Sequence, residues 1–187
     1  MRWIVLGMIL FIAPYTYINL HYRKPGPAYR PYDDMREREH LGQAGYKRIT
    51  ARISRPADSG FVPGGGDPAA GGLPDALRAS LLEQPLLAAA IGSVSAAPTA
   101  SSAAAYQIRF TGTQADNKQQ PADARLYVKD NAIFVVPGYE RLDGGLLART
   151  RESVLAVTVP PGALSPGTYR VTLVGRNASR AWTLQVH

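Results

Sequence analysis

The chain has 187 residues, no cysteine, and 21 basic against 14 acidic side chains, which gives a net charge of +7. The absence of cysteine excludes disulfides and thiolate metal sites. Because basic and acidic residues are mixed along the chain, the composition argues against a dedicated nucleic-acid surface, which needs a clustered basic face.

The first predicted element is an uncharged, strongly apolar segment at residues 3–20. A membrane-crossing helix needs about 20 residues, with about 17 as the lower limit. Aromatic residues near both ends match the two headgroup levels of a bilayer. We therefore predict a single transmembrane helix, with residues 1–24 as the membrane anchor. A cleaved signal peptide is the alternative, although Pro14 follows directly after Ala13, where cleavage is disfavoured.

A spacer follows the anchor at residues 25–58. Its prolines predict a stiff, extended start, and Asp33 is a suitable N-cap for a short polar helix at residues 34–43. Residues 46–55 then alternate between apolar and polar side chains, which predicts a half-buried strand.

A lone strand is not stable, so the strand at residues 46–55 must pair with something. One possibility is that it adds a strand to the C-terminal domain. The other is that it docks onto another protein by strand addition. In the second case the docking residues are Arg48, Ile49, Arg52 and Ile53.

A Gly/Pro-rich linker is predicted at residues 59–73. Its glycines lack the sequence context of a phosphate-binding loop. Pro74 and Asp75 then begin a predicted short helix that ends before Pro85 and carries a leucine face. That face either packs on a neighbouring sheet or binds a partner. A first strand of the C-terminal domain is expected at residues 91–96.

From residue 106 onward, short alternating runs recur with turn signals between them. Several short strands at this spacing predict an antiparallel β-sandwich. The expected strands begin at residue 106 and continue at residues 124–129, 132–136, 154–159, 168–175 and 181–186.

Residues 164–174 read Leu-Ser-Pro-Gly-Thr-Tyr-Arg-Val-Thr-Leu-Val. This segment resembles the E–F corner and F strand of immunoglobulin-like and fibronectin-like domains. The resemblance implies that the Tyr169 hydroxyl bonds back to the backbone just upstream, as a tyrosine corner. The predicted fold is therefore mainly β, with an immunoglobulin-like β-sandwich, preceded by the short helix, at residues 74–187.

No group of residues in the chain demands a particular chemistry. His21, His40 and His187 do not share metal-ligand spacing, and the nucleophile motif Gly-x-Ser-x-Gly does not occur. Most acidic residues of the C-terminal region fall in predicted turns, where Asp is ordinary turn chemistry. We predict no enzyme activity, no catalytic, cofactor-binding or metal-binding residue, and no cofactor, and the sequence identifies no small-molecule ligand.

The predicted function is a non-enzymatic binding or assembly protein, anchored in the cell membrane by one helix. It would serve as an accessory subunit or adaptor of a membrane or envelope complex, with a membrane protein as its partner. The basic residues after the anchor favour a cytoplasmic domain by the positive-inside rule. We nevertheless expect an exported domain, because immunoglobulin-like domains on N-terminal anchors are commonly exported.

The alternative function is a membrane-tethered module that binds carbohydrate or cell wall. Its signature would be aromatic side chains exposed on one face of the sheet. The candidates are Tyr127, Phe134, Tyr139 and Trp182.

Overall fold

A computed structural model of the chain describes residues 2, 8, 10–17, 31–56, 64–142, 144 and 146–187. The chain divides into two compact units, Met1–Asp34 and Met35–His187. In the first unit residues 10–17 are helical. The rings of Phe11 and Tyr15 stack there, with 6.5 Å between their centroids.

The predicted transmembrane helix at residues 3–20 is wrong for the part of the chain that the structure describes. No helix in that part is both long and apolar enough to cross a membrane. The continuous helical run within the predicted anchor covers residues 10–17. Most other residues of the predicted anchor lie outside the described residues.

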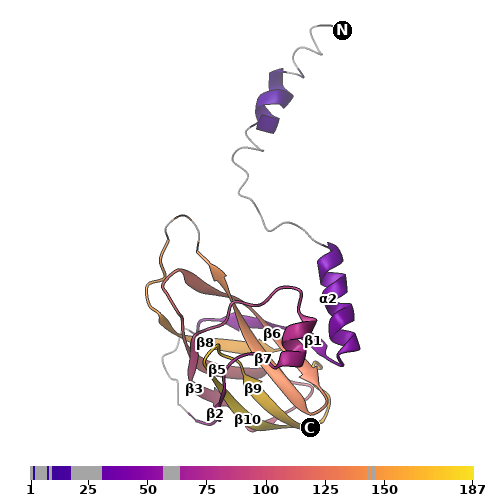
Figure 1. Ribbon diagram of the computed structural model, residues 1–187, viewed down its shortest axis with the longest axis vertical. Coiled ribbons are helices and arrows are strands. Elements are labelled where there is room, and N and C mark those ends of the chain that lie inside the picture. The colour runs from indigo at the N-terminus through magenta and orange to yellow at the C-terminus, as the bar shows by residue number, and fades with distance from the viewer. Residues whose placement is uncertain are drawn as a thin grey trace. The chain divides into compact units, whose positions relative to one another are not determined.

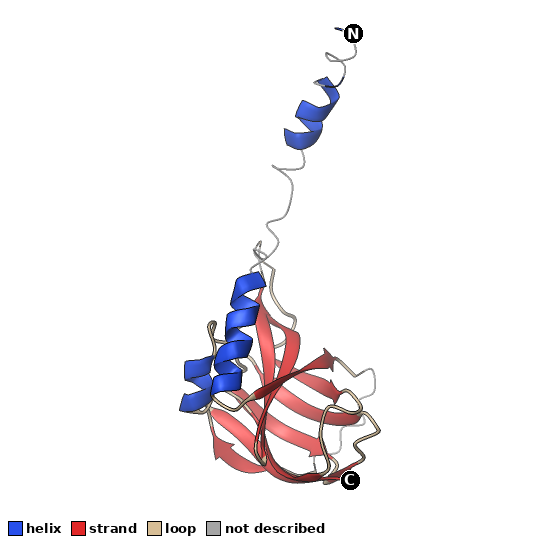
Figure 2. Ribbon diagram, turned by 90° about the vertical axis from the view of Figure 1, so that its right-hand side faces the viewer, coloured by secondary structure: helices blue, strands red, loops and turns tan. Residues whose placement is uncertain are grey.

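The second unit is a closed β-barrel (Figures 1 and 2), and the strand pairings show that eight strands form its wall. Around the barrel the strands follow the order β10, β3, β5, β8, β1, β6, β7 and β9, and β9 pairs with β10 to close the ring. Their bounds are β1 (Lys47–Ser54), β3 (Ala90–Ala96), β5 (Tyr106–Thr113), β6 (Gln119–Lys129), β7 (Ala132–Arg141), β8 (Glu152–Val159), β9 (Gly167–Leu173) and β10 (Ala178–Val186). Two short strands, β2 (Asp67–Ala70) and β4 (Thr99–Ala100), pair with β10.

The predicted immunoglobulin-like sandwich is therefore wrong, although the mainly β character is right. Two sets of pairings account for the difference. β1 lies between β6 and β8 and pairs antiparallel with both. β9 pairs antiparallel with β10 and parallel with β7. A sandwich keeps two separate sheets. These pairings instead join all eight strands into one closed sheet, which has no free edge strand.

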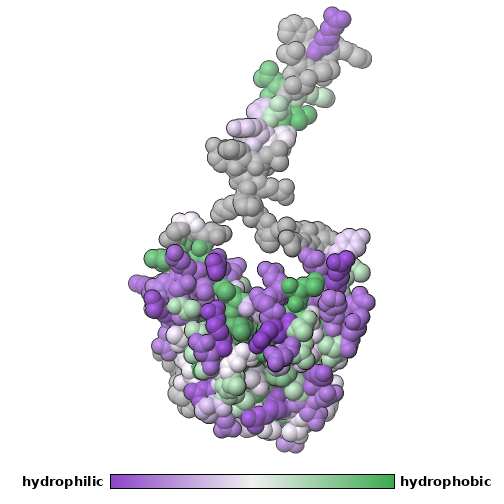
Figure 3. All heavy atoms as spheres, in the orientation of Figure 1, coloured by the Kyte–Doolittle hydropathy of each residue, from purple (hydrophilic) through white to green (hydrophobic). Residues whose placement is uncertain are grey.

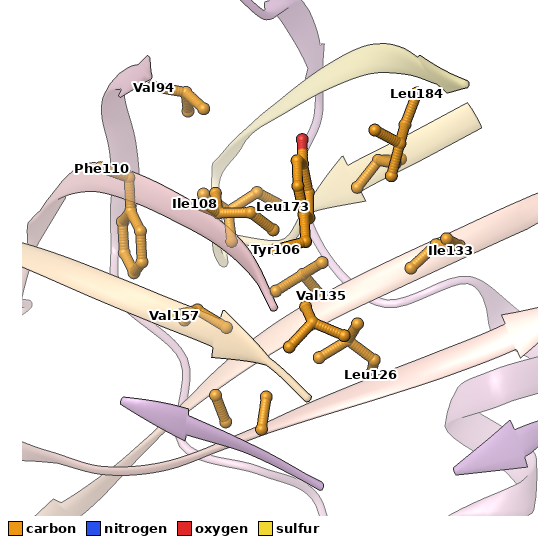
Figure 4. Close-up of a cluster of buried hydrophobic side chains, with 14 of the residues drawn as sticks. Val94, Tyr106, Ile108, Phe110, Leu126, Ile133, Val135, Val157, Leu173 and Leu184 are labelled. Atoms are coloured by element: carbon orange, nitrogen blue, oxygen red, sulfur yellow. The ribbon is translucent and has the colours of Figure 1, made fainter. Parts of the chain in front are cut away.

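Alternate side chains of the eight strands fill the barrel interior. Figure 4 shows this core, with apolar side chains from β3 and from β5 to β10 converging on one another. Phe110, Leu155, Val157, Leu173 and Leu184 are fully buried in it. An interior of eight strands is just wide enough for side chains to fill, so most of this barrel is a packed core.

Two helices, α2 (Pro31–Gln43) and α3 (Asp75–Ser80), cover the outside of the barrel. Figure 2 shows both in blue on the same side of the strands. Leu41 of α2 and Leu77 of α3 belong to a second apolar cluster, together with Tyr127, Val136 and Val174 on the outer face of the barrel. α3 ends earlier than the sequence predicts. Part of the predicted linker at residues 59–73 forms β2, and residues 59–63 of it lie outside the described residues.

Candidate binding site

Tyr169 lies at the start of β9 and is buried. Its hydroxyl donates a hydrogen bond to the backbone carbonyl of Ser165, at 2.9 Å. A bond of this type, from a tyrosine to the backbone just before its strand, was implied by the resemblance to immunoglobulin-like domains. Here it occurs in a barrel. The bond stabilises the turn before β9 and offers no group to a ligand.

The four predicted docking residues lie in the barrel wall. Ile49 is buried and Ile53 packs against the core. The Nη1 atom of Arg48 donates to the Oε1 atom of Glu37 on α2, at 2.8 Å, and Arg52 is exposed. The backbone of β1 pairs with β6 from residue 47 to 51 and with β8 from residue 52 to 54. The strand therefore finds its pairing partners within this chain.

The four aromatic candidates for carbohydrate binding do not form an exposed platform. Tyr127, Tyr139 and Trp182 are buried, and Phe134 is half-buried against the outer apolar cluster. Burial raises the pKa of Tyr127, while the neighbouring Arg125 lowers it. These rings are used for packing, so they cannot stack on a sugar.

Apart from Tyr32 and Met35 on α2 and Leu82 after α3, the exposed large hydrophobic side chains in the described part of the chain lie in two places. The first is the helical segment of the N-terminal unit. Its exposed side chains are Met8, Leu10, Phe11, Ile12, Tyr15 and Tyr17. The second is the loop between β7 and β8, where Leu146 and Leu147 are 64% and 63% exposed. The visible face of the barrel is otherwise largely hydrophilic, with small apolar patches (Figure 3).

The β7–β8 loop is held to the neighbouring loop before β6 by several hydrogen bonds. The backbone N–H of Leu142 donates to the carbonyl of Lys118 at 2.8 Å, and that of Ala148 donates to Asn117 at 2.6 Å. The Nε atom of Arg151 donates to the Asn117 side chain at 3.2 Å. These bonds connect residues on both sides of Leu146 and Leu147 to the loop before β6. The signal in the sequence was a Leu-Leu pair after Gly-Gly in a predicted loop, and sequence reasoning missed it.

A polar groove of about 330 Å³ lies outside the barrel, between residues 83–86 and the outer faces of β6 and β7. The register of these strands shifts between Pro121 and Ala124. At this bulge the Asp123 carboxylate accepts a hydrogen bond from the Nε atom of Arg125, at 2.8 Å. The carboxylate lies over Gly138, where a Cβ would overlap it. The groove is lined by the ion pair of Asp123 and Arg125, whose charges already satisfy each other.

The described residues contain no group of three or more His, Asp or Glu side chains placed to hold a metal ion. Comparison of the chain with protein-family models, curated proteins and solved structures finds no match.

Proposed function

We propose that this protein is a non-enzymatic binding or assembly protein that is attached to a membrane and docks a partner protein through its barrel. The observation that carries the proposal is the gathering of exposed hydrophobic side chains in two described segments, residues 8–17 and the β7–β8 loop. The protein would then serve as an accessory subunit or adaptor at the cell membrane.

The apolar side chains of residues 8–17 support the membrane attachment. Leu10, Phe11 and Ile12 are exposed next to each other, with Tyr15 and Tyr17 close behind. Burying one such aliphatic or aromatic side chain contributes about 1.5–3 kcal/mol. Tyrosine rings favour the level of the lipid headgroups. An apolar segment of this kind binds in proportion to the area that it buries in the bilayer interface.

The leucines of the β7–β8 loop support partner docking. An isolated exposed leucine needs no explanation, but Leu146 and Leu147 are adjacent, and backbone hydrogen bonds are made by Leu142 before them and Ala148 after them. Burying one leucine side chain contributes about 1.5–3 kcal/mol, so the pair offers a partner an apolar centre. Exposed Arg149 and Arg151 follow the leucines and add a polar rim around the apolar centre, as in many protein interfaces.

Membrane attachment is tested by flotation of the full-length protein with liposomes. Replacing Leu10 and Phe11 by serine should lower the partition constant for the liposomes at least tenfold, because two buried side chains are worth more than about 1.4 kcal/mol together. The matched control is the double variant Leu146→Ser and Leu147→Ser, which should float like the unchanged protein. Equal flotation of all three proteins would contradict the attachment.

Partner docking is tested by crosslinking in native membranes, followed by affinity capture and mass spectrometry. The unchanged protein should capture a stoichiometric partner that the Leu146→Ser and Leu147→Ser double variant loses. Leu82→Ser serves as the control, because Leu82 is also exposed but lies just after α3, outside the β7–β8 loop. The proposal fails if the double variant captures the same proteins in the same amounts.

A further inference from the structure

The strands of the barrel wall are joined unevenly, and the junction of β3 with β10 differs from the others. β9 and β10 pair along a continuous ladder from Gly167 with Val186 to Leu173 with Arg180. β3 and β10 share one register pair, between the residues with which the two parallel strands begin, Ala90 and Ala178. In the described part of the chain no further register pair joins them. We call the stretch between residues 91–96 of β3 and 179–184 of β10 the seam.

A short segment before the first helix of the barrel wall fills this seam. β2 pairs antiparallel with residues 178–181 of β10, on the edge of β10 that faces away from β9. At its other end the segment reaches β3, where Gly64 bridges to Ser95 and its backbone N–H donates to the carbonyl of Val94 at 3.1 Å. β2, β3 and β10 lie next to one another in Figure 1. Residues 64–70, which we call the strap, therefore connect the two sides of the seam.

The strap itself is weakly held. Three of the four residues of β2 are exposed, and Pro68, the register partner of Arg180, has no N–H to donate. Gly65 and Gly66 have φ angles of +104° and +93°, which favour glycine and leave these positions without a side chain to bury. A Cβ on Gly65 would meet no atom within 4 Å. Segments with so little buried apolar surface open at a lower free energy than the core.

A side chain closes the part of the seam where backbone pairing is missing. The Nε atom of Arg180 donates to the carbonyl of Gly92 across the seam, at 2.7 Å. Gly92 lies in the stretch of β3 where the register with β5 shifts, between Ile91 and Val94. A hollow of about 330 Å³ lies beside this bond, so the seam is also not tightly packed. It is lined by Gly64, Gly65, Gly66, Asp67, Gly92, Ser93, Val94 and Arg180.

The barrel core lies directly behind the seam. Val94 of β3 and Trp182 and Leu184 of β10 are buried members of the interior cluster. A Cβ on Gly66 of the strap would lie 3.6 Å from the Cβ of Val94. Separation of the strap would therefore uncover Val94 first, together with the backbone edges of β3 and β10. An extended segment of another protein can pair with edges of this kind.

We propose that the seam is a built-in opening of the barrel, closed by the strap and by the bond between Arg180 and Gly92. The seam opens while the ladders of the other strands stay intact, which makes it a site of local opening within a folded domain. This inference goes beyond the proposed function, which depends on the exposed apolar segments, and either can fail without the other.

The first test uses the absence of cysteine from the chain. Val94→Cys places one thiol behind the seam, and Val135→Cys places one in β7, which pairs with β6 and β9 on its two sides. Both valines are buried, at 2% and 0% exposure, and a buried thiol is inert until it is uncovered. Each full-length variant is labelled with a maleimide under native conditions and followed by mass spectrometry. We expect Val94→Cys to react at least tenfold faster than Val135→Cys.

The second test removes the side chain that crosses the seam. Arg180→Ala, added to Val94→Cys, should speed labelling about tenfold more, because a hydrogen bond from a charged donor changes an equilibrium constant by about that factor. Arg170→Ala is the matched control, since Arg170 is exposed on β9, and it should leave the rate unchanged. Arg180→Ala should also leave the rate of Val135→Cys unchanged.

Circular dichroism of each variant establishes that it is folded before the rates are compared. Faster labelling at position 94, increased by Arg180→Ala alone, supports the opening. Equal rates for Val94→Cys and Val135→Cys overturn it, because both thiols are then uncovered only by unfolding of the whole barrel. The proposal also fails if Arg180→Ala speeds labelling at both positions equally, or at neither, since the arginine then does not hold the seam.

Discussion

The change of Tyr106 to phenylalanine removes one hydroxyl, and with it two hydrogen bonds. The Tyr106 hydroxyl donates to the carbonyl of Ala97 at 2.8 Å and accepts from the indole N–H of Trp182 at 3.2 Å. Ala97 is exposed, so water can replace the lost donor there. Trp182 is buried, and its N–H would be left without a partner.

A buried donor without a partner costs about 1–3 kcal/mol. We therefore expect Tyr106→Phe to lower the free energy of unfolding by about 2 kcal/mol. Tyr139→Phe is the matched control, because Tyr139 is a second buried tyrosine of the interior cluster but its hydroxyl has no hydrogen-bond partner in the structure. Removing that hydroxyl should change the stability by less than about 0.5 kcal/mol.

The assay is thermal unfolding of the full-length protein followed by circular dichroism. For a domain of this size, 1 kcal/mol shifts the unfolding midpoint by about 2–4 °C. Tyr106→Phe should therefore unfold about 4–8 °C below the unchanged protein, and Tyr139→Phe within about 2 °C of it. Equal shifts for the two variants would refute the reasoning, since the two changes differ mainly in the hydrogen bonds that they remove.

Three further outcomes are expected. Stability should fall between pH 10 and 12, because burial raises the pKa of Tyr106 and of Tyr139 from 10.0 to about 12. The unfolded chain then loses these protons first, which lowers the free energy of unfolding by up to about 2–3 kcal/mol per tyrosine. Chemical denaturation at each pH measures this loss. Gly175→Ala should lower the free energy of unfolding, measured from the urea midpoint, by about 1–3 kcal/mol, because its Cβ would overlap the backbone carbonyl of Ala178. Glu37→Gln should cost about 2 kcal/mol in the same assay, since it removes the charge that pairs with the arginine of β1.

Much of the secondary structure was predictable from local sequence. The alternation of Ile49, Ala51 and Ile53 with polar residues indicated the strand that became β1, and similar runs indicated the strands from β5 to β10. Pro74 and Asp75 indicated the start of α3. In each case a pattern of period 2, or a helix start signal, reports which face of a segment is buried, and this depends on neighbours in the sequence.

The surroundings of single side chains were far less predictable. Tyr139 was predicted as an exposed aromatic residue, but the structure buries it in the barrel interior. Its hydroxyl lies beside Gly112 of β5, a residue far from it in the sequence, so no local pattern could indicate this contact.

The sequence by itself determined that this chain is mainly β, where most of its strands lie, and which side of each strand is apolar. Only the tertiary structure decided which strands are neighbours. β1 fills the space between β6 and β8, and β9 joins β7 to β10, so the strands close into a barrel. The physical reason is that period-2 alternation specifies a buried face equally well for a sandwich and for a barrel. The choice between them depends on contacts between residues far apart in the chain.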